Sequence, residues 1–260
     1  MIAVTATVNA CTRKDIIRKL DMNGCTFIHE SPDRPNIYYS VKLRTNLDTD
    51  LANVVDDLKT NSVKALRVII YCKSLNMCAD LYAHFLYELG SMSYYPPGAE
   101  ETASNRLFGM YHSSTSPHNK AVILKSMEAL DGTIRVVFAT NALGMGVNFA
   151  GVNTVIHYGA PHSLDDYLQE SGRGGRTGEK ATSTIYWCAS DAKKYKEAKN
   201  KRMEETLAVR LYLENTTECR RHQLLRYFNQ TEEHADNETL NPLCCDVCRD
   251  KKVSSQNHQS

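Results

Sequence analysis

The chain has 260 residues and 42% hydrophobic content, which suffices for one ordinary domain and a smaller module. Its 31 basic and 30 acidic residues leave a formal net charge of +1, so any nucleic-acid-binding surface must be local. Residues 1–9 lack a basic leader and no apolar run reaches the length of a membrane span. We therefore expect a nuclear or cytoplasmic protein, neither secreted nor membrane-bound.

Residues 1–35 do not have the pattern of a domain's beginning. Ile2–Thr7 predicts a short buried strand, and Arg13–Leu20 predicts a charged helix after it. Such a strand has no sheet of its own. We expect this segment to be the end of a preceding unit and the crossover to the next.

Residues 36–190 alternate between short apolar runs and segments of helical period. Strands are predicted at Ile37–Val41, Arg67–Cys72, Leu107–His112, Ile134–Ala139, Thr154–Tyr158 and Thr184–Trp187, and helices at Asn76–Leu89, Pro117–Leu130 and Leu164–Ser171. This alternation predicts a mainly parallel sheet with helices on both faces. Functional sites in such sheets form past the carboxyl ends of the strands, where Ser74, His112, Ser113 and Thr140 fall.

The connection over residues 90–105 is much longer than a typical loop and contains Tyr94-Tyr95-Pro96-Pro97. We interpret it as a surface insertion. The pattern assigns it no role.

The most informative stretch is Gln169–Arg176, which reads Gln-Glu-Ser-Gly-Arg-Gly-Gly-Arg. Ser163 can cap the helix before it, and Gly172 can end that helix. Arg173 and Arg176 then leave the helix on a glycine-rich loop, where a pair of guanidinium groups suits a polyphosphate. The alternative is a glycine-arginine surface loop, which could bind RNA.

A second glycine-containing turn, Thr140–Phe149, follows a predicted strand. Its spaced glycines can bring backbone amides close to a phosphate. Taken by itself, this pattern is weak.

The composition changes from Asp191 onward. A basic run over 193–202 predicts either a solvated helix face or a stripe that follows a DNA backbone. Cys219 and His222 lie one helical turn apart, and Cys245 and Cys248 have the spacing of a zinc knuckle. The chain has nine cysteines and no secretory leader, which favours metal over disulfides. The fourth ligand is Cys244 or a histidine, His222 or His234.

These motifs resemble superfamily-two helicases of the RecQ type, and the resemblance covers nearly the whole chain. Gln169–Arg176 matches motif VI, Gln-x-x-Gly-Arg-x-Gly-Arg, at every fixed position. Thr140–Phe149 resembles motif V, Val68–Ser74 motif IV and Thr5–Thr7 motif III. Arg34-Pro35-Asn36 resembles the crossover between the two RecA-like domains.

The resemblance implies a division into a remnant of the first RecA-like domain (1–35), the second RecA-like domain (36–190) and a helical zinc subdomain (191–250). The lysines and polar residues that follow predict a disordered tail (251–260). The same resemblance implies that Arg173 and Arg176 are arginine fingers and that Gln169 couples the ATP site to DNA. Further implied roles are ATP binding for Gly146 and Asn148, contact with the DNA strand for Ser74 and Thr140, and zinc binding for Cys219, Cys244, Cys245 and Cys248. Asn148 stands where relatives usually carry aspartate, which removes a charge near the ATP ribose.

The resemblance also implies ATP and Mg²⁺, but the sequence contains no Gly-x-x-x-x-Gly-Lys-Ser/Thr loop and no Asp-Glu-x-His-like pair. We therefore expect the carboxyl-terminal portion of an ATP-dependent 3′–5′ DNA helicase of recombination or repair, which acts on single-stranded or 3′-tailed DNA. It would be inactive without a first RecA-like domain. The alternative is a stand-alone ATPase-dead module that binds DNA or a protein.

Overall fold

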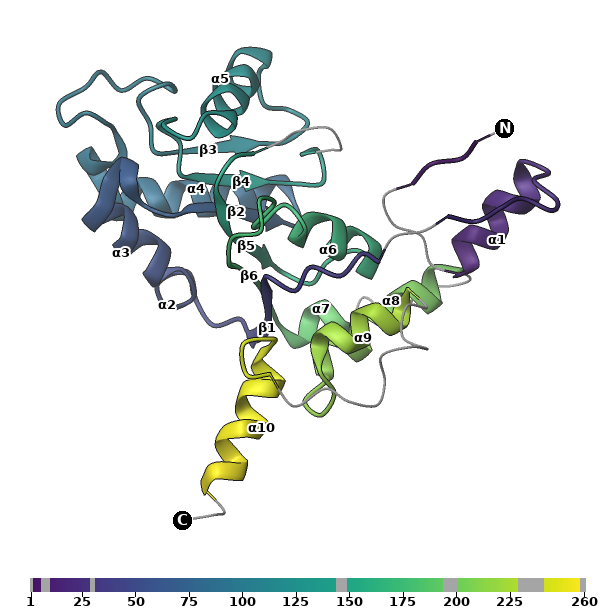
Figure 1. Ribbon diagram of the computed structural model, residues 1–260. Coiled ribbons are helices and arrows are strands. Elements are labelled where there is room, and N and C mark those ends of the chain that lie inside the picture. Colours follow the sequence, from purple (N-terminus) through teal and green to yellow (C-terminus); the bar gives the residue numbers. More distant parts are fainter. Residues whose placement is uncertain are drawn as a thin grey trace.

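A computed structural model describes residues 2–5, 10–28, 31–143, 149–193, 201–228 and 241–257 (Figure 1). Its centre is a six-stranded, fully parallel sheet with the strand order β1-β6-β5-β2-β4-β3. The strands are β1 (Ile37–Leu43), β2 (Arg67–Cys72), β3 (Phe108–Tyr111), β4 (Val136–Ala139), β5 (Val152–Tyr158) and β6 (Ala181–Trp187). This confirms the parallel sheet predicted from the sequence.

Helices cover both faces of the sheet, as predicted. On one face lie α2 (Leu47–Asp50), α3 (Ala52–Asn61) and α4 (Leu75–Leu89), and on the other lies α5 (Pro117–Glu128). The central strand β2 is buried at every position, and its alternate residues serve the two faces. Val68 and Ile70 pack under α4, whereas Ile69 and Tyr71 pack under α5. A continuous apolar run therefore forms this strand because both of its faces are dry.

The carboxyl-terminal helices gather beside β1. They are α6 (Leu164–Ser171), α7 (Ala189–Lys193), α8 (Lys201–Glu214) and α9 (Arg220–Tyr227), and α10 (Asp246–Asn257) points away from the sheet (Figure 1). A third apolar cluster joins them to the sheet through Tyr39, Tyr167 and Tyr212, all fully buried. Among the helices of the described residues, none is long and apolar enough to cross a membrane.

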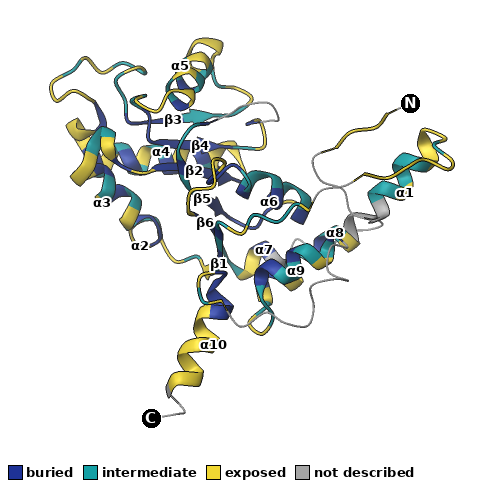
Figure 2. Cartoon of the chain, viewed as in Figure 1, coloured by how far each residue is buried: buried dark blue, intermediate teal, exposed yellow. Residues whose placement is uncertain are grey.

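Two predictions near the chain ends are wrong. Residues 2–5 form no strand, and Ile2 and Val4 are about nine-tenths exposed because no described strand pairs with them. The tail predicted to be disordered is helical as far as Asn257, because α10 starts at the buried Asp246 and continues into solvent. Figure 2 shows α10 buried at its first turn and exposed beyond it. The basic run at 193–202 has no described side chains.

The outer edge of β1 is closed by the cysteine-rich segment. The amide of Tyr39 donates to the Cys244 carbonyl at 3.2 Å, and the amide of Val41 donates to the Asp246 carboxylate at 2.9 Å. Free strand edges invite unwanted pairing. Here residues more than 200 positions away in the sequence occupy the edge.

Arg67, at the start of β2, fastens α5 to the sheet. Its guanidinium is buried and donates to the carbonyls of Ser126, Met127, Ala129, Leu130 and Ala150. Burial lowers the pKa of Arg67 to about 10, so the group remains charged at neutral pH. The last carbonyls of a helix have no hydrogen-bond donor within the helix. The Arg67 guanidinium is the donor for the carbonyls at the end of α5 and just beyond it.

Replacing Arg67 with methionine should lower the free energy of unfolding by about 3 kcal/mol, because several buried carbonyls lose their donor. Urea unfolding followed by circular dichroism measures the change. Lys64→Met, three residues earlier at an exposed position, is the control and should shift stability by less than about 0.5 kcal/mol. Equal stability of the two variants would contradict the role of Arg67.

Candidate functional site

The arginine-containing loop directly follows the helix α6. The hydroxyl of Ser163 accepts a hydrogen bond from the amide of Asp166 at 3.0 Å, and the helix ends at Ser171 with Gly172 as its cap. Both features confirm the predicted helix. The loop over 172–180 then leads into the amino end of β6.

The crossover segment holds this loop in place. The Arg34 guanidinium donates to the carbonyls of Gly172, Gly174 and Gly175, the last at 2.8 Å. The Asn36 side-chain amide donates to the carbonyls of Gly175 and Glu179. The loop carbonyls are therefore turned toward the crossover and bound there.

Gly175 is the residue that makes this contact possible. Its φ of +57° lies in the left-handed region, and a Cβ atom at this position would collide with Asn36 and with the carbonyl of Glu179. Only glycine combines that backbone angle with so close an approach. The glycine directly before Arg176 thus sets the direction in which Arg176 leaves the backbone.

The two arginines of the loop have different surroundings. Arg173 is 5% exposed, and its guanidinium donates to the carbonyl of Leu143 at 3.0 Å. Arg176 is exposed. Partial desolvation and the nearby cations of Arg173 and Arg34 lower the pKa of Arg176. A polyanion at this place would relieve the repulsion among the three guanidinium groups.

Glu170, inside the motif, binds inward instead of toward a ligand. One of its carboxylate oxygens lies 2.8 Å from Nε2 of His157, and both side chains are largely buried. The His157 ring stacks on Tyr71 with a centroid distance of 5.1 Å. Gln169, the preceding residue, is half-buried on α6.

Ser74 and Thr140 lie at the carboxyl ends of the neighbouring strands β2 and β4, on one edge of the sheet. Ser74 is exposed and caps α4, accepting from the amide of Met77 at 3.2 Å. Thr140 opens a turn, with its hydroxyl 3.4 Å from the amide of Ala142. Gly146 and Asn148 lie outside the described residues.

The Thr140 turn and the arginine loop are in contact. Leu143 donates its amide to the Thr140 carbonyl at 3.0 Å, and its own carbonyl accepts from Arg173. Leu143 therefore connects the Thr140 turn to Arg173, through its amide on one side and its carbonyl on the other.

Four cysteine side chains form a separate cluster between α9 and α10. The sulfur atoms of Cys219, Cys244, Cys245 and Cys248 all lie within 4.8 Å of one another, and three of the four residues are buried. A tetrahedral zinc site with Zn–S bonds of about 2.3 Å has sulfur atoms roughly 3.8 Å apart. The Sγ atoms of Cys219 and Cys244 are 3.4 Å apart, and those of Cys219 and Cys245 are 4.0 Å apart. The spacing fits one tetrahedral ion.

The surroundings of the cluster supply hydrogen bonds to sulfur. Cys245 Sγ accepts from the backbone amides of Arg220 and Cys248, and Cys244 Sγ accepts from the Arg221 guanidinium at 3.2 Å. Hydrogen bonds from the Cys219 and Cys244 thiols and from these two amides lower the pKa of Cys245. Donors that stabilise a thiolate suit a metal ligand, because the thiolate is the form that binds zinc.

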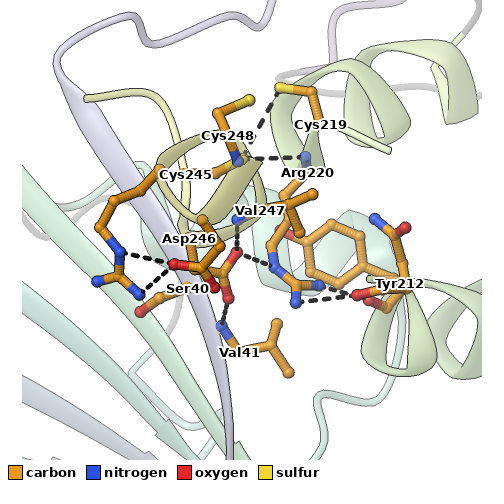
Figure 3. A network of polar contacts seen from close by, with 12 residues as sticks. Ser40, Val41, Tyr212, Cys219, Arg220, Cys245, Asp246, Val247 and Cys248 are labelled. Atoms are coloured by element: carbon orange, nitrogen blue, oxygen red, sulfur yellow. Dashed lines mark hydrogen bonds and ion pairs between the residues drawn. The ribbon is translucent and has the colours of Figure 1, made fainter. Parts of the chain in front are cut away.

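Charged residues beside the cysteines anchor the cluster to the sheet. Arg220 pairs with Asp246 at 2.5 Å and donates to the carbonyl of Tyr212 at 2.8 Å. Figure 3 shows Asp246 between Arg220 and the amide of Val41, with Cys245 and Cys248 at the start of α10 and Cys219 at the start of α9. Arg221 reaches Asp33 and the carbonyls of Pro35 and Ile37.

Cys244, and not His222, is the fourth member of the cluster. His222 lies outside the cluster, with its Nδ1 atom 3.4 Å from Glu218. His234 lies outside the described residues. Cys244 completes the set of four despite its adjacency to Cys245.

Sequence reasoning missed the residues that support both sites. Arg34 and Asn36 belong to the predicted crossover, but nothing in the sequence pattern connects them to the arginine loop about 140 positions later. Arg220 and Asp246 directly follow predicted ligands, and Arg221 is two residues from Cys219. Their charges, close in sequence to the cysteines, are the available signal.

Two family models match the chain. The "Helicase conserved C-terminal domain" model matches residues 50–178, and the "RecQ zinc-binding" model matches residues 180–249. Together they span both sites described above except for the crossover.

Several curated relatives match nearly the full chain. The ATP-dependent DNA helicase hus2/rqh1 of Schizosaccharomyces pombe is 29% identical over 94% of this chain and 18% of its own length. The ATP-dependent helicase SGS1 of Saccharomyces cerevisiae is 30% identical over 96% of this chain and 16% of its own length. The ATP-dependent DNA helicase Q1 of Pongo abelii is 27% identical over 99% of this chain and 37% of its own length. The chain thus spans less than half the length of these relatives.

Solved structures agree on the fold. Mycobacterium smegmatis helicase Lhr, bound to ssDNA and AMP-PNP, has a TM-score of 0.54 at 19% identity, over 89% of this chain and 32% of that one. S. cerevisiae Dbp5, bound to RNA and ADP BeF3, has a TM-score of 0.53 at 17% identity, over 88% of this chain and 49% of that one. These likenesses establish a RecA-like sheet. The two family models and the matches to relatives over nearly the whole chain show that the chain belongs to the RecQ-type helicases and corresponds to their carboxyl-terminal region, a second RecA-like domain followed by the RecQ zinc-binding region.

Proposed function

We propose that this chain is the nucleotide-sensing and DNA-tracking half of an ATP-dependent 3′–5′ DNA helicase, which works in the nucleus in recombination or repair. The observation that carries the proposal is the braced arginine loop. Three carbonyls bound by Arg34 and a left-handed Gly175 hold Arg176 at the surface, beside two further guanidinium groups. A preorganised cluster of cations is what a polyphosphate in its transition state requires.

In this proposal Arg176 is the arginine finger. It is exposed and would reach an ATP bound by a first RecA-like domain, where a guanidinium stabilises the charge on the transferring phosphoryl group. The neighbouring Arg173 is buried against the Leu143 carbonyl, so its role is to transmit changes between the arginine loop and the Thr140 turn. Gln169 stands at the end of the same helix and serves the same coupling.

The DNA strand would lie along the carboxyl edge of the sheet. Ser74 and Thr140 occupy that edge on adjacent strands, and hydroxyl groups there can donate to backbone phosphates. The ATP side would include Gly146 and Asn148. ATP and Mg²⁺ would be held chiefly by the first RecA-like domain, whose phosphate-binding loop these 260 residues do not contain.

Zinc is the metal that the four cysteines would hold. Four thiolates in tetrahedral spacing favour zinc among the common ions. Bound there, the ion would cross-link the start of α9 to the start of α10 and thereby fix the segment that closes the edge of β1. In a small helical module with little core of its own, metal binding contributes much of the folding free energy.

The arginine assignment is tested in a longer protein that joins this chain to a first RecA-like domain. Arg176→Ala should lower DNA-stimulated ATP turnover by at least about 10³-fold, because one arginine finger is worth that much. Single-stranded DNA binding should stay within about threefold. Lys180→Ala, which removes an exposed cation from the same loop, is the control and should leave turnover unchanged. Unchanged turnover in Arg176→Ala would refute the finger assignment.

The 260-residue chain alone should bind single-stranded DNA weakly and should not hydrolyse ATP. Fluorescence polarisation across a salt series should give an affinity that falls steeply with salt, because the contacts are mainly to phosphates. An ATPase assay with DNA supplies the second measurement. Robust ATP hydrolysis by the chain alone that Arg176→Ala abolishes would contradict the assignment of ATP binding to a first RecA-like domain. Salt-insensitive DNA binding would contradict the phosphate contacts.

The metal assignment is tested by Cys248→Ser. The purified wild-type chain should carry one zinc per molecule, whereas the variant should have little zinc and should aggregate, since three thiolates bind more weakly and the edge of β1 loses its cover. Elemental analysis and light scattering measure both effects. Cys25→Ser, at an exposed cysteine outside the cluster, should keep the zinc. Full zinc content in Cys248→Ser would refute the ligand set.

A further inference from the structure

We propose that His157 is a positioning residue for the arginine loop, which acts through a single hydrogen bond to Glu170. This bond fixes the last turn of α6, and with it the direction in which Arg176 leaves the loop. The effect of His157 on ATP turnover rests on the proposed function, whereas its effect on the loop does not.

Glu170 lies where the arginine loop leaves α6. Its main-chain carbonyl accepts from the amide of Arg173 at 3.2 Å and also from the amide of Gly172. Its side chain is directed to β5, where one carboxylate oxygen lies 2.8 Å from Nε2 of His157. A carboxylate only accepts, so Nε2 carries the hydrogen and donates it. A rotation of this last turn would therefore move the start of the loop and break the bond to His157 at the same time.

The His157 ring is held firmly in the core of the sheet. It is 2% exposed and belongs to β5, which is paired with β2 on one side and β6 on the other. The ring stacks on Tyr71 at a centroid distance of 5.1 Å and makes an edge-on contact with Tyr167 at 5.0 Å. A donor locked by packing on a central strand can fix its acceptor precisely because it has one position itself.

Packing alone does not explain a histidine at position 157. Nδ1 is buried without a hydrogen-bond partner, which is less favourable than an apolar ring of similar size. A phenylalanine would fill the same space and stack on Tyr71 without burying an unpaired nitrogen. What the histidine adds is the hydrogen bond from Nε2 to Glu170.

The pair is enclosed and therefore does not act on a substrate itself. The side chains of His157 and Glu170 are 3% and 12% exposed. A cavity beside them, bordered also by Asn141 and Lys73, has a volume of about 20 Å³. That volume holds about one water molecule and admits no nucleotide. A role in positioning remains for the pair.

Strand β5 holds the arginine loop at both of its ends. His157, near the carboxyl end of the strand, binds Glu170 at the start of the loop. Val152, the first residue of the strand, accepts from the amide of Gly175 at 2.9 Å. Arg176 follows Gly175 directly, so its direction depends on both contacts. Loss of the first one would leave the loop anchored at one end of the strand only.

Hydrogen–deuterium exchange of the 260-residue chain, followed by NMR, tests the effect on the loop. In His157→Gln the side-chain amide can replace Nε2, whereas in His157→Asn the shorter side chain places its amide near Nδ1 and does not reach Glu170. The amides of residues 173–175 should exchange at least about tenfold faster in His157→Asn than in the wild type, and within about threefold of it in His157→Gln. His118→Asn, the same change at an exposed histidine of α5, should leave the loop unaffected.

Several outcomes would overturn the role of the hydrogen bond. They are wild-type exchange in His157→Asn, equal acceleration in the two His157 variants, and an equal acceleration in the amides of α4, which would show general destabilisation. Should a His157 variant fail to fold, the partner residue gives a second pair. Glu170→Leu removes the acceptor and Glu170→Gln keeps it, so the same difference of about tenfold is expected between them. Equal exchange of that pair would also refute the proposal.

The longer protein that contains a first RecA-like domain tests the consequence for turnover. His157→Asn should lower kcat at least about tenfold, while KM for ATP and the affinity for single-stranded DNA stay within about threefold, because an arginine finger acts mainly in the transition state. His157→Gln should keep kcat within about threefold of the wild type. With Arg176→Ala already present, His157→Asn should cause no further loss, whereas a merely structural defect would add its own.

The same assay separates the two possible failures. Wild-type kcat in His157→Asn, or a further loss in the double variant, would overturn the positioning role while Arg176 remains the finger. Wild-type turnover in Arg176→Ala would instead refute the finger assignment, and the exchange experiment alone would then decide whether His157 positions the loop.

Discussion

The crossover segment Asp33–Ile37 is the part of the chain on which both sites depend. On one side, Arg34 and Asn36 bind the carbonyls of the arginine loop. On the other, Arg221 of α9 reaches Asp33 and the Ile37 carbonyl while also donating to the sulfur of Cys244. Five consecutive residues therefore lie between the cysteine cluster and the arginine loop, which are far apart in sequence.

This arrangement gives the cysteine cluster a role beyond local folding. Asp246 and the Cys244 carbonyl occupy the outer edge of β1, and Arg220 ties Asp246 to α8 through the Tyr212 carbonyl. The strand that leads out of the crossover is thus held on one edge by β6 and on the other by the cysteine-rich segment. A loosened cluster would free the start of β1 and, with it, the brace on Gly175.

Local spacing predicts the sheet, the α6 cap and the Cys245–Cys248 pair, whereas the choice of Cys219 and Cys244 as their partners came from the family resemblance. Val68 and Ile70 alternate with Ile69 and Tyr71 in a run that only a doubly covered strand tolerates. The different environments of Arg173 and Arg176 could not be predicted, since they follow from the position of the Leu143 carbonyl in the folded chain. The same holds for the Arg34 brace, which is a contact across about 140 residues. The strand predicted at Ile2–Thr7 does not form over residues 2–5, because these residues have the composition of a strand but no described strand pairs with them.

The strand order has a consequence for how the protein is made. Ser40 on β1 bonds to Thr184 on β6, 144 residues later, and the outer edge of β1 is closed only by residues near 245. At ribosomal rates of about 5–20 residues per second, β6, the strand that pairs with β1, is synthesised roughly 7–30 s after β1. Strands β2, β4 and β3 can pair in the meantime. The earliest strand of this sheet is therefore among the last to be placed, and it stays open to chaperones and to wrong partners throughout that interval.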